Sequence, residues 1–174
     1  MKIILFIFLI IIINIYNNIL VRGEIDFKVP CGDGYCGYDQ VCYKYNPQED
    51  VSVCLLADQF NLLELVQTFE KTWIDHYGDE YSLFRVKIQN HSNKPITHLY
   101  LATDFTFDLK EKSSYWNIHL DTWNNFLTLP NYVNSIQPFS YHLFGYIVKG
   151  KTSPNMIIRS ITYSDPEIFA NQQY

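Results

Sequence analysis

Three kinds of feature are scarce or missing in this sequence, and each absence removes a class of function. Beyond residue 23 there is no second long apolar run, so we expect no membrane association once residues 1–23 are removed. Without Lys2 and Arg22, 11 basic residues stand against 18 acidic ones, a formal charge of −7. Because nucleic acids and acidic polysaccharides bind basic surfaces, both are poor candidates as partners.

Motifs for nucleophilic catalysis and for metal binding are missing as well. No Gly-x-Ser-x-Gly sequence occurs, and His76 beside Asp75 has no nucleophile motif near it. Asp104 and Asp108 could in principle hold a structural calcium ion, but nothing like a calcium-binding loop surrounds them. We therefore predict that the chain is not an enzyme and holds no metal and no cofactor.

Several acidic residues could still supply the carboxylate pair of a glycosidase. We interpret them as a solvated acidic edge, because acids are common on any surface and a domain this small has little room for a cleft around two of them. These residues are Asp104, Asp108, Glu111 and Asp121.

What the sequence does contain begins with a secretion signal. A short basic start precedes an almost unbroken apolar run over residues 3–13, which Asn14 and later polar residues interrupt. The run is too short for a typical transmembrane helix, so we predict a signal peptide over residues 1–23, cleavage before Glu24, and a secreted, extracellular protein. An uncleaved signal anchor is the alternative, and it would also leave the remainder outside the cytosol.

All the cysteines lie in one short segment, residues 24–56, which is rich in turn-forming residues. An even number of cysteines in a secreted, loop-rich stretch predicts a disulfide framework. So small a segment cannot bury enough apolar surface to fold without such links. A zinc site is the alternative, but the segment has no histidine and the compartment favours oxidation. Three pairings are open for Cys31, Cys36, Cys42 and Cys54.

The spacing of these cysteines resembles that of small follistatin-like or epidermal-growth-factor-like knots. The resemblance implies a crossed pairing, Cys31 with Cys42 and Cys36 with Cys54. We expect the segment to act as a spacer or a partner-binding appendage.

The composition changes between residues 55 and 62, and the chain from residue 63 onward predicts β structure. Phe84, Val86 and Ile88 alternate with polar residues, which indicates a strand with one buried side. Leu99 and Leu101 repeat the pattern in the strand that starts at Ile96. Further strands are predicted over residues 116–121, 125–129, 140–148 and 156–163. We expect a sandwich domain over residues 63–164 and a polar tail over residues 165–174.

Residues 62–73 are ambiguous. Leu62, Leu65, Val66 and Phe69 have the spacing of an amphipathic helix. We predict a strand here instead, because so many short strands separated by turns favour an all-β domain.

Residues 66–163 resemble the family 49 carbohydrate-binding modules, which occur at the ends of plant endoglucanases and in secreted cellulose-binding proteins of social amoebae. The resemblance lies in separated pieces that keep the family's order and spacing. These pieces are Trp73, Tyr81-x-x-Phe84-x-Val86-x-Ile88-x-Asn90, Tyr115-Trp116-Asn117-Ile118, Leu127-Thr128-Leu129-Pro130-Asn131-Tyr132, and Phe144-Gly145-Tyr146-Ile147-Val148 followed by Ser153-Pro154.

This resemblance implies an immunoglobulin-like antiparallel β-sandwich that binds cellulose or a related β-glucan without hydrolysing it. The chain departs from the family at Tyr132, where plant members often carry tryptophan, and at Lys110 and Lys112, which bring charge close to Trp116. We also expect no attached catalytic domain.

Exposed aromatic rings would carry such binding, because a ring stacked on the apolar face of a pyranose leaves the sugar's hydroxyl rim free. If each ring loses roughly 80 Å² of exposure, the gross gain is about 2 kcal/mol. Our candidates are Trp73, Trp116, Trp123 and Tyr132, with Tyr100 and Tyr115 behind them. We rank Trp123 and Trp73 first, since polar turn residues surround them, whereas Trp116 lies among residues typical of a core.

Two other functions stay open at this point. The same rings could form an interaction surface for an extracellular matrix protein, and a small secreted glycosidase is the third hypothesis. Asn90-His91-Ser92 is a glycosylation sequon, so Asn90 could carry a glycan; alternatively, Asn90 closes the turn.

Overall fold

The structure is a computed structural model that describes residues 28–45, 51–59, 61–123 and 125–164. The predicted signal peptide and the polar tail lie outside the described residues. Over the ranges that are described, no helix is long and apolar enough to cross a membrane.

The described residues form strands connected by turns and one short 3-10 helix, η1 (Ala57–Gln59). The strands are β1 (Val29–Cys31), β2 (Gly34–Cys36), β3 (Gln40–Tyr45), β4 (Val51–Leu56), β5 (Leu63–Ile74), β6 (Glu80–Asn90), β7 (Ile96–Thr103), β8 (Tyr115–Trp116), β9 (His119–Asp121), β10 (Phe126–Thr128), β11 (Tyr141–Lys149) and β12 (Met156–Tyr163).

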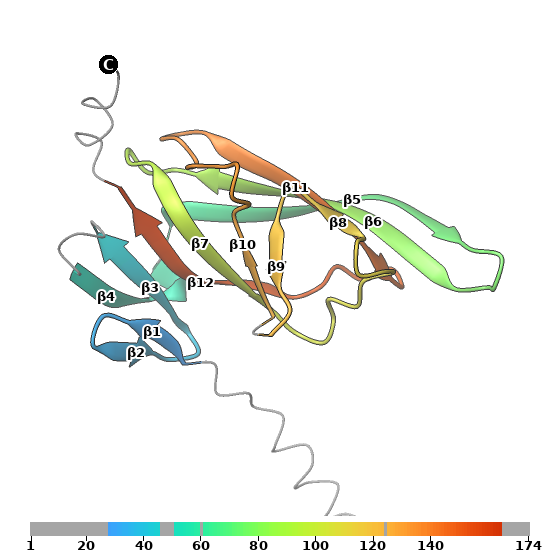
Figure 1. The fold of residues 1–174 in the computed structure, drawn as a ribbon, viewed down its shortest axis with the longest axis horizontal. Coiled ribbons are helices and arrows are strands. Elements are labelled where there is room, and N and C mark those ends of the chain that lie inside the picture. Colours follow the sequence, from blue (N-terminus) through green and yellow to red (C-terminus); the bar gives the residue numbers. More distant parts are fainter. Residues whose placement is uncertain (1–27, 46–50, 60, 124, 165–174) are drawn as a thin grey trace, which may run out of the picture.

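Two sheets pack face to face. One has four strands in the order β5-β6-β11-β8, and the other has six in the order β4-β3-β12-β7-β10-β9. Figure 1 shows them as two layers, with the β5–β6 hairpin extending beyond the sandwich on one side and β1–β4 lying at the other. The predicted all-β sandwich is confirmed.

Alternation along the strands builds the core. On β6, Phe84, Val86 and Ile88 are buried, and Phe144 and Val148 of the neighbouring β11 are buried beside them. Leu99 and Leu101 of β7, with Ile161 of β12, close the core from the six-stranded sheet. Every second residue therefore points inward, which leaves the other half of each long strand on an outer face.

Residues 63–74 form a strand, as predicted. β5 pairs antiparallel with β6 over its whole length, from Leu63 opposite Asn90 to Ile74 opposite Glu80. A register shift between Phe69 and Lys71 is the one irregularity in that pairing. Pairing with a long neighbouring strand outweighs the helical spacing of the apolar residues, since tertiary context overrides local pattern.

The strand predicted over residues 116–121 is instead two strands in different sheets. β8 pairs with β11 in the four-stranded sheet, whereas β9 pairs with β10 in the six-stranded one. Asn117 lies between them with a φ of 58°, in the left-handed region that asparagine tolerates better than most residues. The chain therefore turns from one layer to the other at this asparagine.

The cysteine-rich segment is joined to the sandwich by strand pairing. β3 pairs in parallel with β12, from Cys42 opposite Ser160 to Tyr45 opposite Tyr163. β3 and β4 therefore continue the six-stranded sheet across the boundary predicted between residues 56 and 63. Arg159 lies at a register shift of β12 and donates a hydrogen bond to the carbonyl of Tyr38. This contact is a second link between the cysteine-rich segment and the sandwich.

The cysteines form two disulfides, Cys31–Cys42 and Cys36–Cys54, which is the crossed pairing that the resemblance implied. Cys42 and Cys54 lie opposite each other on β3 and β4, and their bridges tie this strand pair to β1 and β2. The segment thus gains the covalent links that its small core requires.

Candidate functional site

The outer face of the four-stranded sheet carries the most organised group of exposed rings. By alternation, Tyr141, Leu143 and Gly145 of β11 point outward, and the register places them beside Gln89, Lys87 and Arg85 of β6. Tyr141 and Leu143 are exposed, and the ammonium group of Lys87 lies 6.0 Å from the centre of the Tyr141 ring. Two large side chains thus stand in line on this strand.

Trp116 completes the line from the neighbouring edge strand. β8 places Trp116 directly opposite Gly145. A Cβ atom on Gly145 would lie 2.1 Å from Cζ2 of Trp116 and 2.6 Å from Cε2, so the indole occupies the space above this glycine. The side chain is nevertheless 43% exposed. One side of the indole therefore rests on the sheet while the rest stays accessible to a flat ligand.

The residue after Trp116 links this ring to a second one. The hydroxyl of Tyr132 donates to Oδ1 of Asn117 at 3.1 Å, and Nε2 of His142 lies 2.6 Å from the Asn117 carbonyl oxygen. Tyr132 is 71% exposed. We call Trp116, Tyr132, Tyr141 and Leu143 the platform. Its members come from β8, β11 and the connection that follows β10.

Trp73 lies on the same face but at its far end. It is opposite Tyr81 on β6, where the ring centres are 6.1 Å apart, and Lys71 lies 5.5 Å from the indole centre. Four residues along β6 and three strand spacings separate Trp73 from Trp116, which corresponds to roughly 20 Å. Trp73 is half-buried, so it offers less surface than Trp116.

Trp123 lies in a different part of the molecule. It follows β9 at the turn toward β10, where its backbone N–H donates to Oδ1 of Asp121. It is 94% exposed, but it belongs to the six-stranded sheet and sits at the opposite end of the β9–β10 hairpin from Asn117 and Tyr132. The four tryptophan and tyrosine candidates therefore do not form one surface.

Tyr100 and Tyr115, the two secondary candidates for sugar contact, also lie in different parts of the fold. Tyr115 is opposite Tyr146 on β11 and packs against the core, whereas Tyr100 is exposed on the six-stranded sheet. Sequence reasoning missed Tyr141, Leu143 and the role of Gly145. The alternation along residues 140–148 could have marked Tyr141 and Leu143 as outward-pointing, but nothing in the sequence places Trp116 over Gly145.

Three of the four acidic candidates make local contacts. Partial burial alone would raise the pKa of Asp104, but hydrogen bonds from Thr106 and Asn155 outweigh it and hold the pKa below its usual value. Asp108 lies 3.5 Å from Nζ of Lys149. Oδ1 of Asp121 caps the turn at Trp123. Each of these three carboxylates forms a hydrogen bond or an ion pair with another residue of the domain.

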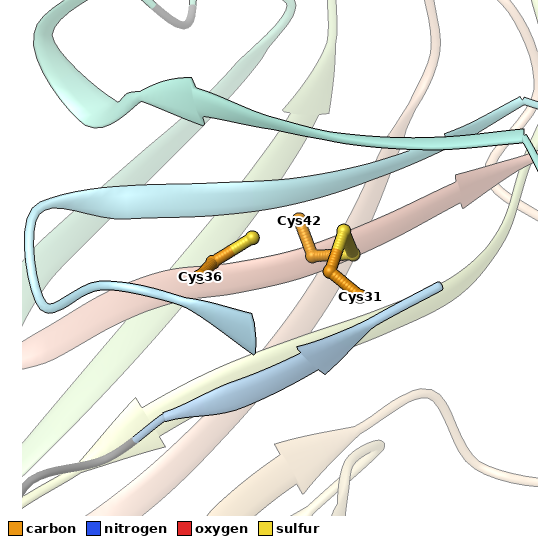
Figure 2. A group of neighbouring side chains, drawn as sticks. All are labelled: Cys31, Cys36 and Cys42. Carbon is orange, nitrogen blue, oxygen red and sulfur yellow. A yellow bond between two sulfur atoms is a disulfide. The ribbon is translucent and has the colours of Figure 1, made fainter. Parts of the chain in front are cut away.

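Among the described residues, one group of three or more metal-ligating side chains is close enough to hold an ion, namely Cys31, Cys36 and Cys42. Figure 2 shows these three side chains gathered between the strands of the N-terminal segment. Each sulfur atom is part of a disulfide, so none offers the thiolate that zinc requires.

Asn90 is completely buried at the end of β6. Its Nδ2 donates to the carbonyls of Lys94, Ile136 and Gln137, and its Oδ1 accepts from Ser92. A glycan on Nδ2 would displace these hydrogen bonds. The geometry therefore favours the alternative interpretation, that Asn90 closes the turn.

Comparison with known proteins identifies a family and two relatives. Residues 63–150 match the family described as "Carbohydrate binding domain CBM49". The chain is 31% identical to stalk-specific protein B of Dictyostelium discoideum and 30% identical to stalk-specific protein A. Each match spans 141 residues, 79% of this chain and 87% of the relative.

Among solved structures, chitinase ChiA74 from Bacillus thuringiensis aligns with a TM-score of 0.42 at 17% identity. The alignment covers 62% of this chain and 16% of the chitinase. That similarity is too low to support an argument about function. The match over residues 63–150, together with the two Dictyostelium relatives, shows that this chain belongs to the CBM49 family of carbohydrate-binding domains.

Proposed function

We propose that this protein is secreted, does not catalyse a reaction, and binds cellulose or a related β-glucan through the platform. The observation that carries the proposal is the position of Trp116, whose indole lies over Gly145 at the exposed edge of a β-sheet. A ring held in this way loses little further freedom when a sugar stacks on it, so more of the contact energy remains as affinity.

The chemistry of the platform suits a neutral polymer. Rings and an aliphatic side chain provide apolar surface, while Gln89 and Lys87 of β6, which alternation places on the same face, provide hydrogen-bonding groups for a hydroxyl rim. If Trp116 loses roughly 80 Å² of exposure on stacking, the gross gain is about 2 kcal/mol. Three rings acting together would give a gross gain of about 6 kcal/mol, which approaches the roughly −8 kcal/mol of micromolar binding.

Trp73 extends the proposed surface toward the β5–β6 hairpin, on the same sheet face as Trp116. We propose that it contributes when the ligand is long enough to reach both rings. Trp123 was ranked first with Trp73 from the sequence. Its separation from the platform leads us to propose that Trp116 contributes more to binding and Trp123 less.

Retention on microcrystalline cellulose tests the proposal. We expect the purified mature protein to sediment with the solid at both low and high salt, because stacking is not screened by ions. Trp116→Ala should weaken apparent affinity about tenfold, equivalent to about 1.4 kcal/mol. The matched variant Trp123→Ala should sediment like wild type, with circular dichroism checking that both variants keep the fold.

Wild-type protein that stays in the supernatant would contradict the proposal and favour an extracellular protein partner for the same rings. Equal losses in Trp116→Ala and Trp123→Ala would contradict the assignment of the platform. A parallel assay for reducing sugar should show no release from cellulose, and turnover by the purified chain would contradict the non-catalytic role.

A further inference from the structure

A groove of about 310 Å³ lies on the six-stranded sheet, away from the platform. Its residues come from β7, from the last residue of β10 and from the connection between β10 and β11. They are Thr97, His98, Leu99, Tyr100, Thr128, Leu129, Pro130, Asn131, Val133 and Asn134. All of them lie in the described part of the chain.

The groove exists because the sheet opens at this point. β10 pairs with β7 at Ala102 and Leu101 and then ends. The connection next meets β7 at the bridge between Ile136 and Ile96. Between these two points the connection after β10 is not paired with β7. One edge of β7 over residues 97–100 therefore faces the groove and not a neighbouring strand. Backbone groups at such an edge are strong hydrogen-bonding partners for a ligand.

The lining selects for a neutral ligand. None of the lining residues is Asp, Glu, Lys or Arg. Asn131, Asn134 and His98 supply amide and imidazole groups that can bond to hydroxyls. The hydroxyl of Thr97 donates to the carbonyl of Thr162 at 3.2 Å. A phosphate or an acidic peptide would find no cation here, so the lining favours a polyhydroxylated, uncharged molecule.

One aromatic ring completes the groove. Tyr100 is 42% exposed, and its ring is held edge-to-face against Phe126 with 6.0 Å between ring centres. A half-exposed ring beside several uncharged hydrogen-bonding groups is the combination that recognises the apolar face and polar rim of a sugar. The volume is at the lower end of the range of ligand pockets, which suits a short stretch of a single chain.

We propose that this groove is a second carbohydrate site, one that takes a single neutral glycan chain, whereas the platform takes a polymer surface. The two sites lie on outer faces of different sheets. Tyr132 adjoins Asn131 and Val133 in sequence, yet its hydroxyl bonds to Asn117 on the platform side, so the connection after β10 separates the sites. A chain with two such sites can hold a free glucan strand against a solid polymer.

The test uses the mature protein and fluorescently labelled cellohexaose as the probe. Binding is first measured in solution with Trp116→Ala as the background protein, which removes stacking on the platform; in this background we expect Tyr100→Ala to weaken binding about tenfold. Tyr35→Ala, which removes an exposed tyrosine outside the groove, is the matched control and should bind like the background protein. The double variant Asn131→Ala, Asn134→Ala changes only surface polar groups and should also weaken binding.

The second arm loads each protein on microcrystalline cellulose and then adds the labelled cellohexaose. Wild type should capture the probe while it stays on the solid, and Tyr100→Ala should stay on the solid without capturing it. Protein that fails to bind the solid would contradict the proposed function alone, because the solution arm still tests the groove. No binding of cellohexaose in solution by the Trp116→Ala background protein, or no further loss when Tyr100→Ala is added to it, would overturn the second site.

Discussion

Asn90 shows at the scale of one residue how a sequence motif and a structural role can coincide. The side chain stands in a glycosylation sequon, but its amide is buried and spans from β6 to the turn at Lys94 and to the connection at Ile136 and Gln137. A polar side chain placed between three carbonyls of separate segments holds those segments in register.

Asn90→Ala should lower the free energy of unfolding by about 2–4 kcal/mol, because it removes several hydrogen bonds and leaves buried carbonyls without a donor. Urea denaturation of the mature protein measures this loss. Asn93→Ala, an exposed asparagine of the same turn, is the control and should change stability by less than about 0.5 kcal/mol. Similar losses in both variants, or a glycan on Asn90 found by mass spectrometry, would contradict this role.

The candidate rings illustrate what can be predicted from residue types alone. Trp116 and Tyr132 were named from the sequence, and they come together through Asn117. Trp123 was named for its polar neighbours, which do predict exposure. Exposure is a local property that neighbours in sequence can indicate, whereas membership of one surface depends on strand pairing across the sheet.

At the scale of elements, the contact between β8 and β11 sets the orientation of the main ring. β8 has only two residues, so Trp116 depends on the smooth surface of β11 beneath it. Gly145 supplies that surface, because any Cβ would meet the indole atoms at less than 3.0 Å.

Gly145→Ala should therefore displace the indole and weaken retention on cellulose about as much as Trp116→Ala, roughly tenfold. The backbone of Gly145 does not have a positive φ, so alanine introduces no backbone strain. Gly34→Ala is the matched control, since a Cβ there would meet only the Cys31 carbonyl oxygen, at 3.9 Å. Wild-type retention by Gly145→Ala would contradict the role of this contact.

The elements also show where local prediction fails. The strands with clear alternating patterns, such as residues 84–88 and 99–101, were predicted because alternation marks a strand with one buried face. The break at Asn117 was not, since residues 116–121 carry a continuous β pattern and only the change of sheet reveals the turn.

At the scale of the whole molecule, the core contains two tyrosines, Tyr146 and Tyr163, whose hydroxyls lose their protons less readily than in water. Burial raises the pKa of Tyr163 to about 12, and it also raises the pKa of Tyr146. In an unfolded chain a tyrosine has a pKa of about 10, so above that pH the unfolded chain loses these protons before the folded chain does.

Stability should therefore be unaffected by these groups below about pH 10 and should fall as pH rises from 10 to 12. Tyr163 alone accounts for up to about 3 kcal/mol of the free energy of unfolding by pH 12. Denaturant unfolding at several pH values checks this, with Tyr163→Phe as the comparison. The variant should lose less stability over that interval, and parallel curves would contradict the assignment.

The sequence by itself determined the class of fold, the cysteine framework and the family, because alternation, residue spacing and motif order are properties of the chain read in one dimension. The family match and the strand pairing agree with those inferences. Only the tertiary structure decided which rings share a surface. Strand order joins residues that lie far apart in sequence, so Trp116 meets Gly145, Trp123 is carried to another sheet, and the opening beside β7 becomes a groove.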